Sequence, residues 1–235
     1  MLEILEQPNK DGWKVLKSTA APEPYHNLVI PETCRTWPEE RLRELGGAGK
    51  IAEAIEIASR RIKDDCLERA QFSVQIGPLA AQNLPHLHYH LYYADELFSE
   101  PNLAEMIIAQ QGDHLKDLLF LENNSFRIVA GGHRTGQCFL LRQDMEEAPL
   151  FNADIAETLS RLIDLYARKF KSVEGMPPDF GLELSIRYGH LAFGTIIPIL
   201  NQIGTLEYMA LMTPKVRRWN LLWSHEETAR CLRGA

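Results

Sequence analysis

Hydrophobic and polar positions alternate with a period of two in several short segments, and this alternation predicts β-strands. Other short runs are rich in β-branched and aromatic residues and end at Pro, Gly or Asn, which is also typical of strands. The predicted strands cover residues 13–18, 26–31, 72–76, 84–93, 126–132 and 136–142, and a strand pair covers 179–200.

Apolar positions spaced three or four residues apart predict the helices. One helix is predicted over 38–70, with Pro38 in its first turn and a break near Gly46 to Gly49. A second is predicted over 152–175, with Asn152 as its cap. The segment 94–124 is interpreted as a mostly helical connector, and the tail is predicted to hold one short helix.

The order strand, strand, helix, strand, strand therefore occurs twice, which indicates an internal duplication. The best match aligns 85–93 with 189–197: His190 repeats His86, and Ala192 and Gly194 stand at the positions of His88 and His90. The interpretation divides the chain into residues 1–120 and a second, degenerate half over 121–235. Two unrelated α+β halves remain the alternative.

The composition is that of a globular protein, with 45% hydrophobic and 24% charged residues among 235. The net charge of −7 argues against a broad surface for nucleic acid or for an anionic membrane. A local site of backbone amides and histidines can still hold a phosphate, because such a site needs no excess of Lys and Arg.

The four cysteines are scattered without CxxC spacing, so we expect neither a disulfide framework nor a cysteine zinc site. The N-terminal residues are acidic and include Pro8, which is unlike a signal peptide. No apolar run approaches the roughly 18 residues that a membrane-spanning helix needs. These features predict a cytoplasmic protein.

The segment 84–93 carries the most specific chemistry, because His86, His88 and His90 alternate with other residues along a predicted strand. Alternate residues of a strand project from one face, so the three imidazoles are expected to lie together. Three explanations stay open: a chance surface cluster, a metal site with a nearby carboxylate, and phosphate chemistry. The preceding loop over 77–83 has small residues that let backbone amides approach an anion closely, which favours phosphate chemistry.

The segment "QIGPLAAQNLPHLHYHL" resembles the signature of the histidine triad (HIT) superfamily, and "YHNLVIPE" is similar to an earlier strand of that family. The resemblance covers about the first 95 residues. It implies an α+β fold with a HIT-like antiparallel sheet and helices. Together with the repeat, it implies a single-chain pseudo-dimer with one intact triad.

The resemblance also implies a mechanism, in which His88 attacks the α-phosphorus of a nucleotide and forms a covalent nucleotidyl-histidine. His90 would contact the phosphate and the leaving group, while His86 and His26 would orient the imidazoles. The residues implied in phosphate binding are Gln75, Gly77, Ala81, Gln82 and Asn83. Those implied beside the nucleoside are Ser18, Leu28 and Ile30.

Several positions depart from the family pattern. Ser18 stands where members usually have Asp or Asn for the ribose, and Glu32 replaces a common Lys. His90 differs from the glutamine that is typical of tandem uridylyltransferases, which favours hydrolysis over transfer.

The function expected from the sequence is therefore a nucleotide hydrolase or nucleotidyltransferase, acting as a monomer without a cofactor. The alternatives are a catalytically decayed nucleotide-binding module and a histidine-ligated metalloprotein.

Overall fold

The computed structural model describes residues 2–6, 12–18, 25–31, 50–76, 87–93, 119–122, 126–131, 136–142, 150–169, 179–199 and 224–233. The strands of this part of the chain are β1 (Leu2–Glu6), β2 (Trp13–Ser18), β3 (His26–Pro31), β4 (Arg69–Ile76), β5 (Tyr89–Tyr93), β6 (Leu119–Glu122), β7 (Phe126–Ala130), β8 (Cys138–Arg142), β9 (Asp179–Arg187) and β10 (His190–Ile199). The helices are α2 (Lys50–Asp64), α5 (Ala153–Lys169) and α7 (His225–Arg233).

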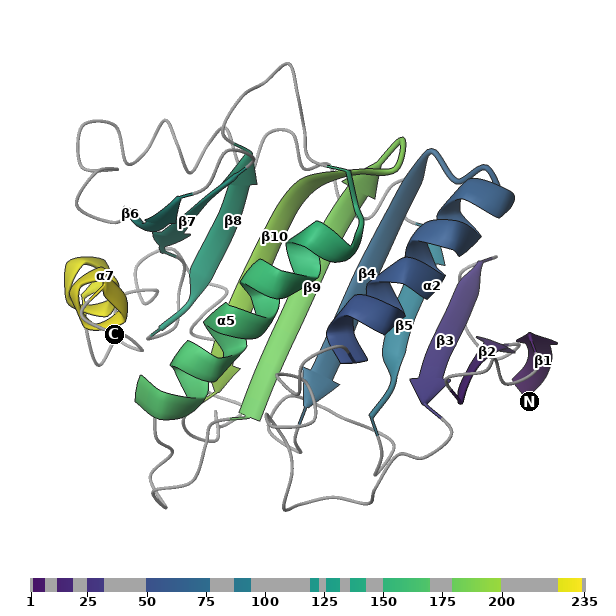
Figure 1. Cartoon of the computed structure of the whole chain (residues 1–235), viewed down its shortest axis with the longest axis horizontal. Coiled ribbons are helices and arrows are strands. Elements are labelled where there is room, and N and C mark those ends of the chain that lie inside the picture. The colour runs from purple at the N-terminus through teal and green to yellow at the C-terminus, as the bar shows by residue number, and fades with distance from the viewer. Residues whose placement is uncertain are drawn as a thin grey trace, which may run out of the picture.

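These strands form one sheet of ten in the order β1-β2-β3-β5-β4-β9-β10-β8-β7-β6, and all neighbours are antiparallel (Figure 1). The α+β class and the antiparallel sheet expected from the sequence are confirmed. The order reads symmetrically outward from the β4–β9 pair. Each side places three strands, one helix and two further strands in chain order.

Two of the strands were not expected from the sequence. β1 lies in the acidic N-terminal segment, and β6 lies inside the predicted helical connector, so that interpretation is wrong at 119–122. Each is a short edge strand with one partner, β2 or β7. Each of these segments is too short for its alternation to be recognised in the sequence. Each is defined as a strand by the hydrogen bonds to its neighbour, β2 or β7.

The helix predicted over 38–70 ends at Asp64 in the structure. Cys66 adopts a left-handed φ of 51°. The amide of Leu67 donates to the carbonyl of Ile62 at 2.9 Å, and that of Cys66 donates to Lys63 at 3.2 Å. These two bonds form a Schellman motif, which stops the helix six residues before its predicted end. The strand β4 then begins at Arg69, three residues before its predicted start. The predicted break near Gly46 lies outside the described residues.

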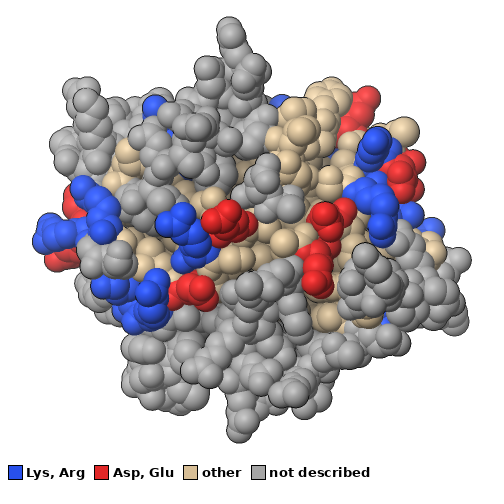
Figure 2. All heavy atoms as spheres, in the orientation of Figure 1, with Lys and Arg blue, Asp and Glu red and all other residues tan. Residues whose placement is uncertain are grey.

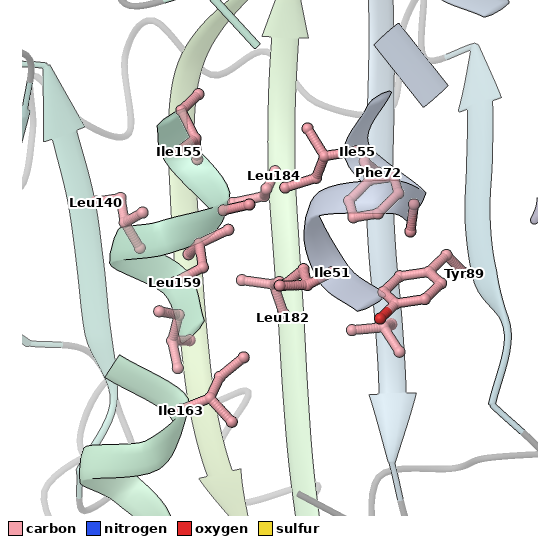
Figure 3. Packing of buried hydrophobic residues seen from close by; sticks show 14 of the residues in the cluster. Ile51, Ile55, Phe72, Tyr89, Leu140, Ile155, Leu159, Ile163, Leu182 and Leu184 are labelled. Atoms are coloured by element: carbon pink, nitrogen blue, oxygen red, sulfur yellow. The ribbon is translucent and has the colours of Figure 1, made fainter. Parts of the chain in front are cut away.

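The hydrophobic core lies between the sheet and the two long helices, which cover the same face of it (Figure 1). Ile51 and Ile55 of α2 and Leu159 of α5 point towards the central strands (Figure 3). Phe72 stacks on Tyr89 with ring centroids 5.2 Å apart, and both side chains are fully buried. The face of β4 and β5 that carries these rings is therefore the helix face.

The short helix α7 lies beside β6 and β7 near one end of the sheet (Figure 1). It begins with a capping box, in which the Glu227 amide donates to Ser224 Oγ and the Ser224 amide donates to the Glu227 carboxylate. This helix confirms the one expected in the tail.

Over the helix-covered face, the described basic and acidic side chains lie close to one another (Figure 2). Within the described residues, this face therefore presents mixed charge rather than a basic surface of the kind that binds nucleic acid. In the same part of the chain, none of the helices has both the length and the apolar composition needed to cross a membrane.

Candidate functional site

Two histidines of the predicted strand, His88 and His90, lie on the face of the sheet opposite the helices. His90 is part of β5, and His88 immediately precedes that strand. Tyr89 and Leu91, which alternate with them, are fully buried in the core. The alternation expected from the sequence is therefore present, because residues one apart in a strand face opposite ways.

The β3–β5 pair brings His26 to the same place from a distant part of the sequence. His26 lies opposite Tyr92, and Leu28 lies opposite His90. The Nε2 atom of His26 is 2.9 Å from Nδ1 of His90, a hydrogen bond in which one nitrogen carries the proton and the other accepts it. The two rings are nearly parallel, with centroids 5.2 Å apart, and Tyr92 meets His26 edge-on.

His88 completes the group from the other side of His90. The centroids of these two rings are 4.8 Å apart at an interplanar angle of 69°. The side chain of His88 is only 4% exposed. His90 therefore sits at the centre of three imidazoles in continuous contact, and it links His26 to His88.

The environment of His90 keeps its imidazole neutral near pH 7. Burial, together with charge repulsion from the neighbouring His88 and His26, lowers the pKa of His90 to about 4. A neutral imidazole can accept a proton or attack an electrophile, whereas an imidazolium can do neither. The hydrogen bond to His26 fixes which ring nitrogen of His90 remains available.

The other predicted site residues divide into two groups. Leu28 and Ile30 are described, each is 6% exposed, and they line the strand beside His90 on its own face. Gln75 lies on β4, opposite Gly181, and its side chain is partly exposed. Ser18 ends β2, in register with Leu2. The predictions for Gly77, Ala81, Gln82, Asn83 and His86 lie outside the described residues.

The structure adds polar residues that the sequence analysis missed. Ser73 lies directly opposite His90 on one side and opposite Glu183 of β9 on the other. Gln71 lies two residues from Ser73, on the same face and opposite Tyr92. Burial raises the pKa of Glu183. A signal for this polar face was present in the sequence, because polar residues alternate along "RAQFSVQI".

The row through these residues crosses the centre of the sheet. His90, Ser73, Glu183 and Thr195 are consecutive partners on β5, β4, β9 and β10. Thr195 in turn lies opposite Phe139, just as His90 lies opposite Leu28. Because the strand order is symmetric about β4 and β9, Thr195 mirrors His90.

This register differs from the repeat alignment in the sequence, which placed Gly194 at the position of His90. A Cβ on Gly194 would lie 2.8 Å from Leu184 Cδ2 and 3.2 Å from Leu140 Cβ, and both of these residues belong to the core. Gly194 therefore faces the helix side. The shift arises from a register irregularity in β10 between Leu191 and Phe193, which a comparison of sequences cannot reveal.

The mirrored positions carry no imidazole. Gln137 takes the place of His26, and its Nε2 donates to Thr195 Oγ1 at 3.4 Å. Phe193 takes the place of His88 and packs against Phe139 with centroids 5.6 Å apart. These two rings belong to a small apolar cluster with Val129 and Leu141. Where one half of the sheet presents three imidazoles, the other presents an amide, a hydroxyl and an aromatic cluster.

In the described part of the chain, no group of three or more His, Cys, Asp or Glu residues is arranged as a set of metal ligands. His90 contacts His26 through ring nitrogens and contacts His88 ring to ring. Within the described residues, the geometry that is present is that of a hydrogen-bonded imidazole cluster.

Solved structures with a similar fold include two proteins from Arabidopsis thaliana. An ADP-glucose phosphorylase with bound ADP-glucose has a TM-score of 0.68 and 15% identity, and the match covers 100% of this chain and 86% of that one. A galT-like protein has a TM-score of 0.65 and 16% identity, and the match covers 99% and 88%. A uridylyltransferase mutant has a TM-score of 0.60 and 18% identity, and the match covers 99% and 88%.

At these identities the similarity establishes a shared fold. It extends over nearly the whole chain, so the complete ten-stranded sheet is part of it. No protein-family model and no curated protein matches the sequence.

Proposed function

We propose that this protein is an enzyme that acts at the α-phosphate of a nucleotide through a covalent intermediate on His88. The observation that carries the proposal is the continuous contact of His26, His90 and His88 on one face of the sheet. Support comes from the fold, which is similar to those of an ADP-glucose phosphorylase and a uridylyltransferase.

The proposed reaction has two displacement steps at phosphorus. In the first, a ring nitrogen of His88 forms a bond to the α-phosphorus, and the bond from phosphorus to the leaving group breaks. The leaving group departs with the electron pair of that bond and takes up a proton. In the second, water or another acceptor attacks the same phosphorus, loses a proton and releases His88.

His90 is suited to manage the proton in both steps. It contacts His88, and it is neutral near pH 7 because of its lowered pKa. Its hydrogen bond to His26 lets the two imidazoles share positive charge that develops on either ring. We propose that His26 positions His90 and that His86 positions His88, as the resemblance to HIT proteins implies.

The proposed ligand contacts follow the same resemblance. We assign phosphate binding to the loop residues Gly77, Ala81, Gln82 and Asn83 together with Gln75. Leu28 and Ile30 offer an apolar strand beside His90 for the nucleoside. We place Ser18 near the ribose, where the shorter serine changes the hydrogen-bonding reach from that of Asp or Asn.

We further propose that the chain consists of two duplicated halves, 1–120 and 121–235, which form a pseudo-dimer with one active site. The symmetric strand order supports the duplication. Gln137, Phe193 and Thr195 support the loss of the second site, because none of these side chains can act as a nucleophilic imidazole. A single chain would then be the functional unit.

The test is intact-protein mass spectrometry after brief mixing with donors of AMP, GMP and UMP, quenched at alkaline pH because phosphohistidine is labile to acid. We expect a nucleotidyl-sized mass increase in the wild type and in His225→Ala, whose histidine lies on α7 at an end of the sheet. We expect none in His88→Ala or His88→Gly.

The other outcomes separate the alternatives. Thermal stabilisation by nucleotides without any adduct or turnover would favour a binding module that has lost its chemistry. An adduct that persists in His88→Gly would assign the nucleophile to another residue. The absence of adduct, turnover and stabilisation would reject the nucleotide proposal and favour a histidine-ligated metal site, to be tested by metal analysis of the purified protein.

A further inference from the structure

His26 is the first residue of β3, so its contact with His90 depends on the end of a strand. The register of β2 with β3 ends at the pair of Lys17 and Asn27, one residue short of His26. Strand ends open more readily than the middle of a sheet. A hydrogen bond of 2.9 Å between two side-chain rings therefore requires that the chain beside His26 be held in place.

Tyr25, the residue before His26, makes two contacts that hold the chain there. Its carbonyl accepts a hydrogen bond from the Tyr93 amide at 3.1 Å, which continues the pairing with β5 past the end of β3. Its hydroxyl donates a hydrogen bond to the carboxylate of Asp65, the residue that follows α2. Tyr25 is therefore joined both to the neighbouring strand and to the end of a helix.

The tyrosine side chain lies on the helix side of the sheet, where it packs against the hydrophobic core. His26 faces the other side, because consecutive residues of an extended chain project in opposite directions. Burial and the hydrogen bond to Asp65 raise the pKa of Tyr25, so the hydroxyl keeps its proton and remains a donor at neutral pH.

Asp65 is oriented for this contact by Arg61, one helical turn earlier. Arg61 Nη2 lies 2.6 Å from Asp65 Oδ2, the same oxygen that accepts the bond from Tyr25. The two side chains of the ion pair are 18% and 27% exposed, so solvent screens it only in part. A carboxylate at the C-terminal end of a helix is disfavoured by the helix dipole. The position of Asp65 thus favours a role in holding Tyr25 over a role in stabilising α2.

We propose that Tyr25 and Asp65 are positioning residues for the histidine cluster: their hydrogen bond fixes the start of β3 and so holds His26 against His90. Without this bond, the two imidazoles lose their fixed contact, and the proton that they share is no longer confined to one ring nitrogen. In the part that rests on the proposed function, His88 then becomes labelled more slowly, because His90 no longer presents the same nitrogen.

The first measurement is the long-range proton–nitrogen NMR spectrum of the imidazoles at pH 7, in the protein without any ligand. The nitrogen shifts of a neutral imidazole identify its tautomer. The wild type should show one tautomer each for His26 and His90, because their hydrogen bond assigns the shared proton to one nitrogen. Tyr25→Phe and Asp65→Ala should show shifts that are averaged over both tautomers.

The second measurement is the rate at which His88 is labelled in single-turnover mixing with a nucleotide donor. Tyr25→Phe and Asp65→Ala should each be labelled about tenfold more slowly than the wild type. The double variant should be no slower than either single one, because both substitutions remove the same hydrogen bond. Asp65→Asn keeps an oxygen that can accept from Tyr25, so it should recover most of the wild-type rate.

Glu53→Ala is the matched control. Glu53 accepts a hydrogen bond from the indole of Trp13, so this pair also joins α2 to a strand through side chains. Trp13 lies on β2, whose residues include no histidine. Glu53→Ala should therefore lower the Tm as Tyr25→Phe does, and it should leave the imidazole spectrum and the labelling rate unchanged.

Two results would overturn the proposal. A wild-type imidazole spectrum in both Tyr25→Phe and Asp65→Ala would show that their hydrogen bond does not position His26. An equal change of the spectrum in Glu53→Ala would attribute the effect to general stability. Neither result depends on the proposed function: a wild type that no donor labels would reject nucleotidyl transfer, and the spectra would still decide whether Tyr25 positions His26.

Discussion

Gln137 donates a hydrogen bond to Thr195 at the position that mirrors the contact between His26 and His90 across the sheet. The two pairs occupy equivalent places, because the rows through Thr195 and His90 meet at the central β4–β9 pair. The imidazoles of one pair are titratable bases, whereas the amide and the hydroxyl of the other are not. The two halves of the sheet share their architecture and differ in their chemistry.

This difference predicts one nucleotidyl group per chain. If the proposed function is correct, single-turnover mixing should label the wild type to a stoichiometry of one, as measured by intact mass. Thr195→Val removes the hydroxyl that Gln137 contacts and should leave both the stoichiometry and the labelling rate within about twofold of wild type. A second adduct on the same chain would contradict the assignment of a single site.

His90 predicts a dependence of stability on pH. Its folded-state pKa of about 4 lies below its ordinary value of 6.5, so the unfolded chain binds a proton more readily than the folded one. The stability that depends on a neutral His90 is fully present above pH 6.5 and is lost as the pH falls towards 4. The loss should reach about 3 kcal/mol at most.

The measurement is the free energy of unfolding between pH 4 and 7 for the wild type and His90→Gln. The glutamine is neutral throughout and can still hydrogen-bond His26. Its curve should fall less steeply with acid than the wild-type curve. Parallel curves for the two proteins would show that His90 does not carry this dependence.

Substitution by alanine should change the stability of the protein unequally at two glycines of the sheet, Gly194 of β10 and Gly181 of β9. A Cβ at Gly194 would lie 2.8 Å from Leu184 Cδ2 and 3.2 Å from Leu140 Cβ, so Gly194→Ala must displace the core. We expect a loss of about 1–3 kcal/mol. At Gly181 the nearest atom is Ile197 O at 4.0 Å, so Gly181→Ala should change stability by no more than about 1 kcal/mol. Urea unfolding of both variants checks the contrast, which equal losses would refute.

The cysteines predict unequal reactivity in the folded protein. Cys138 is fully buried, its Sγ lies 2.6 Å from the Tyr166 hydroxyl, and burial raises the pKa of its thiol. Cys66 is exposed at the end of α2. Because the thiolate is the reactive form, iodoacetamide should modify Cys66 about a hundredfold faster. Peptide mass spectrometry measures both rates, and the difference should disappear in denaturant.

Local sequence was sufficient to predict most of the secondary structure. Period-two alternation located the strand with His88 and His90, and Tyr89 and Leu91 pack into the core as that alternation requires. The α5 helix was equally readable from its apolar spacing. Both features depend on residues close together in the chain. The prediction failed where β6 and the start of β4 depend on partner strands and on the left-handed turn at Cys66.

The histidine cluster needed both kinds of information. The sequence by itself determined that His88 and His90 share a face, because that follows from strand geometry alone. The sequence suggested His26 only through the resemblance to the HIT superfamily. Its repeat alignment placed Gly194 at the position of His90, whereas the structure places Thr195 there.

Only the tertiary structure decided which residues meet across strands. It set His26 against His90, Gln137 against Thr195 and Arg69 against Arg187. Cross-strand register is a property of two segments that pair at long range, and a shift of one residue moves every side chain to the other face. The local pattern of either strand does not specify the register between the two. That register decides which side chains of this sheet lie close enough to react together.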